Sequence, residues 1–330
     1  TERTMTEVLN PRTHGRVALQ VEAGVGRGAA VAARAVRGHE GADSLAEAAS
    51  FRSIIDRLDE HPSRSFFILK TITINNLYGV DILEEAVEIC KLRLFLRLVS
   101  EIERVEDLEP LPDIDFNVRA GNSLVGYATA DEVRASFEEL SGGQRKLIFE
   151  EAASDYDSFE KRLEETDATF RNYQEMQTAD ASDGAIADTK HSLRDQLAEL
   201  ANELNHHLAR DYGVDPDRTD QYGAWKTSHQ PFHWFAEFYG IVSGGGFDVI
   251  IGNPPYVEYA QVASTYAVRD DEMVELGNLH AMVTLRCLRL LAEDGALGLV
   301  VPVALPSTSR FERLSAPRRK SRGGHAASLS

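Results

Sequence analysis

Apolar residues in this chain recur first at helical spacing and then in short unbroken runs. The helical spacing covers residues 45–58 and 66–74, with a break at His61-Pro62 between them. A short apolar run over residues 77–82 follows, with Asp81 near its end, and residues 84–99 return to helical spacing. This part of the chain therefore predicts two helices, a strand with an acidic tip and a further helix.

Two further apolar runs each end in a polar turn. Residues 114–118 lead into Arg119-Ala120-Gly121-Asn122-Ser123-Leu124, and residues 247–251 lead into Gly252 and Asn253-Pro254-Pro255-Tyr256. An aromatic stretch at residues 232–239, which predicts a helix, and a glycine turn at residues 244–246 precede the second run. Both runs therefore predict strands that end in a candidate binding loop.

A last helix and strand complete the pattern. We expect the helix over residues 279–291 to end at Glu293-Asp294-Gly295, because glycine suits a helix C-cap, and residues 297–301 to form a strand. Continuous apolar strands that alternate with helices predict an α/β fold with a doubly wound, mainly parallel sheet.

Residues 131–230 interrupt this alternation with a charged, helical region. Each of two stretches has apolar residues on one face, namely Tyr156, Phe159, Leu163, Phe170 and Tyr173, and then Leu193, Leu197, Leu200, Leu204 and Leu208. The polar segment 178–188 separates them, so we expect an antiparallel helical hairpin inserted into the fold. Its charged residues favour a solvated outer face over an arm that docks a partner.

Composition sets the remaining bounds. The 330 residues are 43% hydrophobic, which suffices for one large core, and no run approaches the roughly 20 apolar residues that span a bilayer. Without a signal-peptide pattern, a cytoplasmic location is expected. Cys90 and Cys287 lie in apolar helical patterns, so they are expected to be buried hydrophobes, and no metal site is predicted.

The net charge of −18 bears on the class of partner. A chain that grips DNA usually presents a basic face to the phosphates, so this charge by itself argues against nucleic acid. A DNA substrate remains compatible with it if the gripping module lies outside this chain, or if a salty cytoplasm favours acidic surfaces.

Polar residues at the carboxyl ends of the predicted strands are the candidate binding residues, because ligands bind there in open parallel sheets. Asp81 can accept hydrogen bonds from two vicinal ribose hydroxyls, although an acidic residue here is also an ordinary helix N-cap. The Asn122 amide can contact an adenine edge, although an Asx turn that closes the strand explains it equally well.

The loop from Asn253 to Tyr256 is a more specific signal. Pro254 and Pro255 fix two φ angles and supply no N–H, so the loop is rigid and its carbonyl oxygens can accept outside bonds. If the Asn253 side-chain oxygen and the Pro254 carbonyl accept both N–H bonds of an adenine amine, its nitrogen lone pair can attack a methyl donor. Tyr256 can stack on the base, which must first be rotated out of a duplex. The alternative is a rigid surface turn.

These motifs resemble those of gamma-type DNA adenine-N6 methyltransferases of type IIG restriction-modification and BREX phage-defence systems. The resemblance runs from about residue 51 to residue 314, and its most specific stretches are residues 67–70, 76–82, 84–96, 119–124 and 247–256. It implies a class I, Rossmann-like fold that binds S-adenosylmethionine and methylates the N6 amine of adenine in double-stranded DNA.

The resemblance also implies a role for each candidate residue and for each part of the chain. The cofactor would contact Asp81, Ile82, Asn122, Ser123, Gly24 and Gly26, with Asp81 at the ribose and Asn122 near the adenine. The target base would contact Asn253, Pro254, Pro255 and Tyr256. The parts would be an N-terminal segment (1–44), a cofactor-binding half (45–130), the helical hairpin insertion (131–230), a catalytic half (231–314) and a disordered tail (315–330).

The chain departs from the family's pattern towards both ends. The family's Asp-Pro-x-x-Gly-Ser-Gly-x-Phe loop is matched only by the glycine-rich residues 22–29, where Arg27 would place a cation near a sulfonium. After Leu314 the further catalytic strands and the target-recognition domain of the family do not follow. We therefore expect a truncated or frame-shifted product that needs a recognition domain from elsewhere, with defence-system proteins as further candidate partners.

Two alternatives stay open at this point. The same four-residue loop occurs in methyltransferases that act on ribosomal RNA bases or on a release-factor glutamine, although the helical insertion argues against them. A catalytically inactive remnant or interaction module would fit the missing cofactor loop. A nuclease is not predicted within this chain, because no Pro-Asp followed by Glu-x-Lys is present to bind magnesium.

Overall fold

The computed structural model describes residues 15–20, 32–35, 57–58, 61–140, 147–179 and 182–303. Within these residues the strands form one sheet in the order β4-β3-β1-β2-β5-β6, and β1 also pairs with β5. The strands are β1 (Gly15–Gln20), β2 (Ala32–Ala35), β3 (Leu77–Asp81), β4 (Val118–Ala120), β5 (Phe247–Gly252) and β6 (Leu291–Leu299). β2 is antiparallel to β1 and β5, and the other pairs are parallel. The sheet is therefore mainly parallel.

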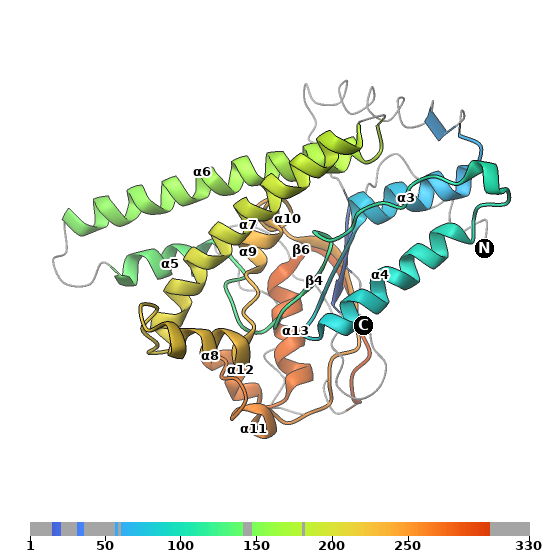
Figure 1. The fold of residues 1–330 in the computed structure, drawn as a ribbon. Coiled ribbons are helices and arrows are strands. Elements are labelled where there is room, and N and C mark those ends of the chain that lie inside the picture. The colour runs from blue at the N-terminus through green and yellow to red at the C-terminus, as the bar shows by residue number, and fades with distance from the viewer. Residues whose placement is uncertain are drawn as a thin grey trace.

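Helices flank the strands and extend well beyond them (Figure 1). They are α3 (Arg64–Asn76), α4 (Glu84–Val99), the short 3-10 helix η1 (Val105–Asp107), α5 (Ala130–Leu140), α6 (Leu147–Met176), α7 (Asp183–Asp211), α8 (Thr219–His229), α9 (Trp234–Glu237), α10 (Tyr239–Val242), α11 (Tyr259–Val262), α12 (Asp271–Leu276) and α13 (Leu279–Leu290). The predicted helices over 66–74, 84–99 and 279–291 and the strands over 77–82 and 247–251 are confirmed.

The register of the parallel strands places their carboxyl ends at one edge of the sheet. Gln20 of β1 lies opposite Val80 of β3, and Leu19 lies opposite Ile251 of β5. On the other side of β3, Asp81 lies opposite Ala120 of β4. The segments that leave β3, β4 and β5 therefore start close together, which is the arrangement expected of a binding edge.

Two predicted elements are wrong at their boundaries. The strand expected over residues 114–118 begins only at Val118, because Ile114 starts a turn whose carbonyl accepts from the Asn117 and Val118 N–H groups, both at 3.0 Å. The Asn117 side chain donates to the carbonyls of Ile74 (2.8 Å) and Leu77 (3.0 Å), so this turn closes the end of α3. The expected single aromatic helix is two short ones, α9 and α10, which meet at Phe238.

The expected helix C-cap at Gly295 is also wrong. α13 ends at Leu290 and β6 begins at Leu291 without a connecting loop, so Gly295 lies inside β6. Between the pairs Phe247–Leu291 and Val249–Ala296 the register of β5 and β6 shifts, which accommodates Glu293, Asp294 and Gly295 as an irregularity within the strand.

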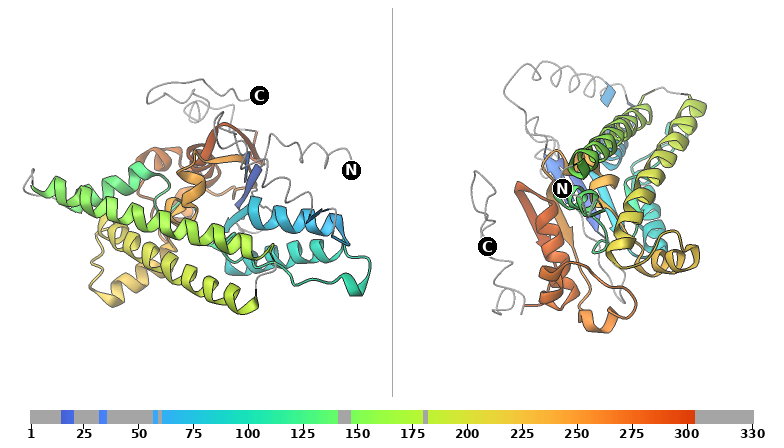
Figure 2. Two further views of the ribbon diagram at one scale, coloured as in Figure 1. Left: turned by 90° about the horizontal axis from the view of Figure 1, so that it is seen from above. Right: turned by 90° about the vertical axis from the view of Figure 1, so that its left-hand side faces the viewer.

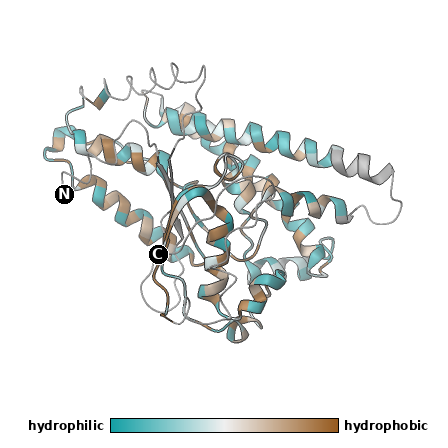
Figure 3. Cartoon of the chain, turned by 180° about the vertical axis from the view of Figure 1, so that it is seen from behind, coloured by the Kyte–Doolittle hydropathy of each residue, from teal (hydrophilic) through white to brown (hydrophobic). Residues whose placement is uncertain are grey.

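The predicted helical hairpin is confirmed as α6 and α7, which lie side by side along one flank of the molecule (Figure 2). The separating segment is shorter than expected, because α7 already begins at Asp183. Hydrophilic and hydrophobic residues alternate along these helices (Figure 3), as is typical of helices with one face on a core. That core is shared, since Phe159 and Leu163 of α6 belong to the same buried cluster as Trp234 and Phe247.

The hairpin is also tied to the first half of the sheet by polar contacts. The Gln174 side chain of α6 donates to the Ile74 carbonyl at 2.6 Å. Lys190 of α7 forms ion pairs with Asp113 and with Asp115, the latter at 2.7 Å. The insertion therefore contacts both halves of the sheet. None of the helices described is long and apolar enough to cross a membrane.

Candidate active site

Asp81 lies at the carboxyl edge of the sheet as the last residue of β3. Its side chain is fully buried, and Oδ1 accepts a hydrogen bond from the Leu83 N–H at 2.8 Å. The N-cap of α4 is Leu83, which makes no side-chain cap bond. The interpretation of Asp81 as an ordinary helix N-cap is therefore wrong, and the carboxylate instead closes an Asx turn at the strand end. Ile82 beside it is half-buried against the core.

Asn122 lies two residues beyond the end of β4 and is buried, with 2% of its surface exposed. Its Oδ1 accepts from the Leu124 N–H at 3.1 Å, so the expected Asx turn is present. Its Nδ2 is also buried, and no acceptor for it lies within hydrogen-bond distance among the described residues. A buried amide donor without a protein partner is costly, so this nitrogen is available to a ligand.

The segment that follows α8 forms backbone hydrogen bonds with the Asn122 loop. The Asn122 N–H donates to the Gln230 carbonyl at 2.7 Å, and the Phe232 N–H donates to the Val125 carbonyl at 2.7 Å. Gln230 has a φ of 44°, in the left-handed region that is rare for residues other than glycine. This backbone strain is consistent with a segment that is fixed by its contacts.

The packing between these two segments leaves no room for a side chain at Gly126. Its φ is +127°, and a Cβ atom there would lie 2.3 Å from the Phe232 carbonyl oxygen. Ser123, buried in the same loop, accepts a hydrogen bond at its carbonyl from the Trp234 indole at 3.1 Å. These contacts join residues more than one hundred positions apart, and they were not predicted from the sequence.

His233, in the same segment, also contacts the chain that follows Asn122. The Tyr127 N–H donates to His233 Nδ1 at 3.2 Å, and His233 Nε2 lies 3.2 Å from Asn205 Oδ1 of α7. Burial lowers the pKa of His233 to about 3, with a further contribution from His207, so the ring is neutral. The loop is therefore tied to the helical insertion as well as to the sheet.

The Asn253 to Tyr256 loop leaves the carboxyl end of β5. Pro254 is buried, Asn253 and Pro255 are half-buried, and Tyr256 is 54% exposed. The Tyr256 hydroxyl lies 3.2 Å from Asn253 Oδ1 and 2.9 Å from the carbonyl of Val300, just after β6. Because β3 and β5 both pair with β1, Asp81 and Asn253 are about two strand spacings, roughly 10 Å, apart.

The N-terminus of α13 supports this loop. The Leu279 N–H donates to the Val257 carbonyl at 2.9 Å, and the ring of His280 meets that of Tyr256 edge-on at 6.0 Å. Burial lowers the pKa of His280, although Glu258 opposes this effect. One side of the loop thus packs against the N-terminus of α13, and Tyr256 is exposed.

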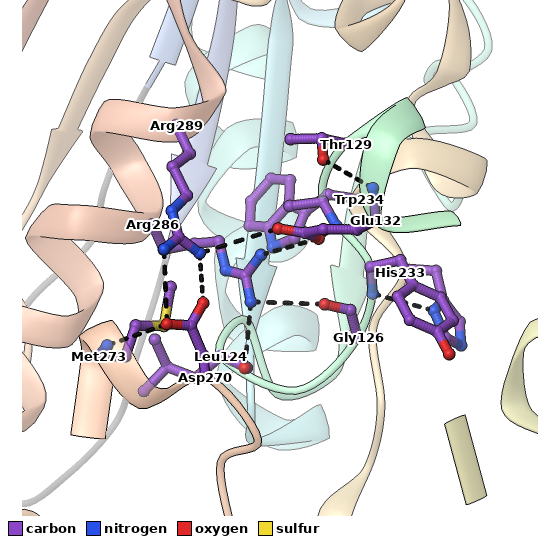
Figure 4. A network of polar contacts seen from close by, with 12 residues as sticks. Leu124, Gly126, Thr129, Glu132, His233, Trp234, Asp270, Met273, Arg286 and Arg289 are labelled. Carbon is purple, nitrogen blue, oxygen red and sulfur yellow. Dashed lines mark hydrogen bonds and ion pairs between the residues drawn. The ribbon is translucent and has the colours of Figure 1, made fainter. Parts of the chain in front are cut away.

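Further along α13, two arginines form a network with acidic residues from other elements (Figure 4). Arg289 bonds to Asp270 at the N-cap of α12 and to Glu272 at 2.8 Å. Arg286 is buried and lies 3.7 Å from Glu132 of α5. Arg286 was not among the residues predicted from the sequence, although an arginine inside the otherwise apolar stretch Leu285 to Leu288 is a signal for a buried polar contact.

The structure brings together Asp81, Asn122, Ser123 and the Asn253 to Tyr256 loop at one edge. Gly24 and Gly26 lie outside the described residues. Within the part of the chain that the structure covers, no group of histidine, cysteine and carboxylate side chains could bind a metal ion. The arrangement offers acceptors at β3 and β5 and a buried donor beyond β4, which suits a ligand that bridges these strands.

Comparison with known proteins gives two matches. Residues 75–318 match a family model described as "Eco57I restriction-modification methylase", a range that includes all three strand ends. A protein of Methanocaldococcus jannaschii named "Putative type II restriction enzyme and methyltransferase" is 30% identical over 274 residues, which cover 74% of this chain. The chain spans only 23% of the length of that relative. No solved structure matches the chain.

Proposed function

Because the chain belongs to the Eco57I restriction-modification methylase family, we propose that it transfers a methyl group from S-adenosylmethionine to the N6 amine of an adenine flipped out of double-stranded DNA. The site would serve a restriction-modification or phage-defence system. We propose that a separate target-recognition domain reads the DNA sequence. A DNA substrate would also place the reaction in the cytoplasm.

The observation that carries the proposal is the meeting of three strand ends at one edge of the sheet. The buried carboxylate of Asp81 lies opposite the end of β4, and Asn122 follows two residues beyond it. A carboxylate can accept hydrogen bonds from two ribose hydroxyls, and a buried amide donor can serve a ring nitrogen of an adenine. These two residues therefore fit the nucleoside portion of S-adenosylmethionine, with Ile82 and Ser123 beside them. The meeting of these strand ends at one edge also supports our proposal that the sheet is doubly wound and Rossmann-like.

The cofactor would supply a methyl group bound to a positively charged sulfur. The chain's own contribution lies in the Asn253 loop, which offers two acceptors, Asn253 Oδ1 and the Pro254 carbonyl. An adenine amine is a weak nucleophile because its lone pair is delocalised into the ring. If both acceptors bind its N–H groups, the nitrogen is free to pyramidalise and to point its lone pair at the methyl carbon.

Tyr256 is suited to receive the flipped base. The residue is more than half exposed, while its hydroxyl lies within bonding distance of Asn253 Oδ1 and the Val300 carbonyl. A base that binds Asn253 Oδ1 would compete with this hydroxyl, which can keep its bond to Val300. Stacking on the ring would offset part of the cost of extrusion, since a base stacked on an aromatic side chain gains roughly 1–3 kcal/mol.

Cofactor binding is the first test of this proposal. Calorimetric titration with S-adenosylmethionine should give saturable binding that weakens roughly 10- to 100-fold in Asp81→Asn, because the charged acceptor for two hydroxyls is lost. Asp115→Asn is the matched control, since this carboxylate precedes β4 at the opposite edge and contacts Lys91 and Lys190. No binding to the folded wild-type chain would overturn the proposal and would favour a catalytically inactive member of the family.

A further inference from the structure

Arg286 is a charged residue inside the core. It lies in the middle of α13, and only 3% of its surface is exposed. Burial lowers the pKa of its guanidinium, against the effect of Glu132, but an arginine side chain keeps its charge in a protein. Removing such a charge from water is costly, so the contacts of Arg286 identify the part of the chain that it holds in place.

Among the described residues, the hydrogen bonds and the ion pair of Arg286 all involve one short stretch of chain, residues 124–132 (Figure 4). The Arg286 Nη2 atom donates to the carbonyls of Leu124 at 3.2 Å and Gly126 at 3.4 Å. Its Nη1 atom lies 3.7 Å from a carboxylate oxygen of Glu132. Its Nε and Nη1 atoms make no hydrogen bond to the described residues. The charge is thus incompletely compensated by the described residues.

The two carbonyls belong to the loop that positions Asn122. Leu124 forms two of the hydrogen bonds in this loop, because its N–H donates to Asn122 Oδ1 and its carbonyl accepts from Arg286. The first bond fixes the plane of the Asn122 amide and so aims its buried Nδ2. The second bond fixes the residue that makes the first. Arg286 therefore acts on the direction of the Asn122 donor without touching it.

The same helix supports the other half of the candidate site. The N-terminus of α13 contacts the chain after Asn253 through the bond from Leu279 to Val257 and through the His280 ring against Tyr256. Arg286 is six positions beyond His280, which is roughly 9 Å along a helix axis. One rigid element therefore contacts both loops and sets the distance between them.

We propose that Arg286 is a positioning residue that holds the Asn122 loop at a fixed distance from the Asn253 to Tyr256 loop. This inference rests on the function proposed above, in which the first loop contacts the cofactor and the second contacts the target base. Transfer between two bound molecules depends on their alignment, and a displacement of about 1 Å can cost on the order of 100-fold in rate.

Arg286→Met and Arg289→Met form a matched pair of variants. Each removes one arginine from the same network and the same helix, but the ion pairs of Arg289 within the described residues are with the side chains of Asp270, Glu272 and Glu132 and not with the carbonyls of the Asn122 loop. We expect S-adenosylmethionine to bind roughly tenfold more weakly to folded Arg286→Met, the equivalent of one lost charge-assisted hydrogen bond. Arg289→Met should bind as the wild type does. Arg286→Lys keeps the charge but places its N–H donors on one nitrogen instead of a guanidinium fork, so its affinity should fall between the two.

The Trp234 indole offers a readout that does not depend on the cofactor. Its N–H donates to the Ser123 carbonyl in the same loop, and the chain has only one other tryptophan, Trp225. The indole resonance of Trp234 in a ¹H–¹⁵N spectrum should shift in Arg286→Met and Arg286→Lys and stay in place in Arg289→Met. This comparison still tests Arg286 if the wild-type chain binds no cofactor, which would defeat the proposed function alone.

Two results would overturn the inference. One is a folded Arg286 variant, methionine or lysine, with wild-type cofactor affinity and an unshifted Trp234 resonance. The other is an equal loss of affinity in Arg286→Met and Arg289→Met, which would assign both arginines a general role in stability. If Arg286→Met does not fold, the cofactor affinity and the Trp234 resonance of Arg286→Lys test the inference in its place.

Discussion

Alanine at Gly126 tests how closely the Asn122 loop is packed against the segment after α8. A Cβ atom at this position would lie 2.3 Å from the carbonyl oxygen of Phe232 and 2.7 Å from its carbonyl carbon. A non-glycine residue at a φ of +127° costs roughly 1–3 kcal/mol, and forcing a methyl group against fixed backbone adds roughly 1–3 kcal/mol. We expect Gly126→Ala to lower the free energy of unfolding by about 4 kcal/mol, a large part of a typical domain's stability.

Gly213→Ala provides the matched control for this prediction. Gly213 also has a positive φ, +72°, but a Cβ atom there would have no neighbour within 4 Å. Only the backbone cost applies, so the loss should be about 1–2 kcal/mol. Urea titration followed by tryptophan fluorescence measures both variants under the same conditions. Equal losses in the two variants would refute the close packing of Gly126 against Phe232.

Three further predictions follow from the site and its support. Tyr256→Phe should keep most methyl-transfer activity because the stacking ring remains, whereas Tyr256→Ala should raise the KM for DNA roughly 5- to 150-fold; equal effects in a kinetic assay would exclude stacking. Burial lowers the pKa of His233 to about 3 and of His207 to about 4, both from 6.5. The unfolded chain therefore takes up protons below pH 6.5 that the folded chain excludes. The contribution of these two neutral rings to stability should be fully present above pH 6.5. It should fall by about 1.4 kcal/mol per pH unit for each ring as the pH drops towards the pKa of the folded state. Urea midpoints that agree at pH 7 and pH 5 would contradict this. Glu237→Gln should cost roughly 1–3 kcal/mol, since it leaves the half-buried Arg119 guanidinium without the carboxylate that lies 2.8 Å away; a thermal melt unchanged from wild type would rule this out.

The parts of the fold that follow from local patterns were predictable. The apolar runs that became β3 and β5 and the helical spacing of α3, α4 and α13 depend on neighbours in the sequence, and these elements are confirmed. The restriction-modification methylase resemblance is confirmed as well. It rested on short stretches of contiguous residues, above all the Asn253 loop and the strand before it.

The errors concern features that distant residues decide. The strand at 114–118 starts late because Asn117 turns to cap α3, more than forty residues upstream. Glycine at position 295 looked like a helix C-cap, but pairing with β5 draws it into β6. The grip of Gln230, Phe232 and Arg286 on the Asn122 loop spans more than one hundred residues, and periodicity carries no information about such contacts. The roles of the site residues and the division into domains stay predictions.

The most direct test of the central claim is detection of the methylated base. The chain is incubated with S-adenosylmethionine and duplex DNA, the DNA is digested to nucleosides, and N6-methyladenine is quantified by mass spectrometry beside an Asn253→Ala variant. The account predicts N6-methyladenine with the wild-type chain and a loss of roughly 10²- to 10³-fold in the variant, as is typical when one group that stabilises a transition state is removed. A chain that binds both S-adenosylmethionine and duplex DNA but leaves the adenines unmodified, or an Asn253→Ala variant that methylates them at the wild-type rate, would contradict it.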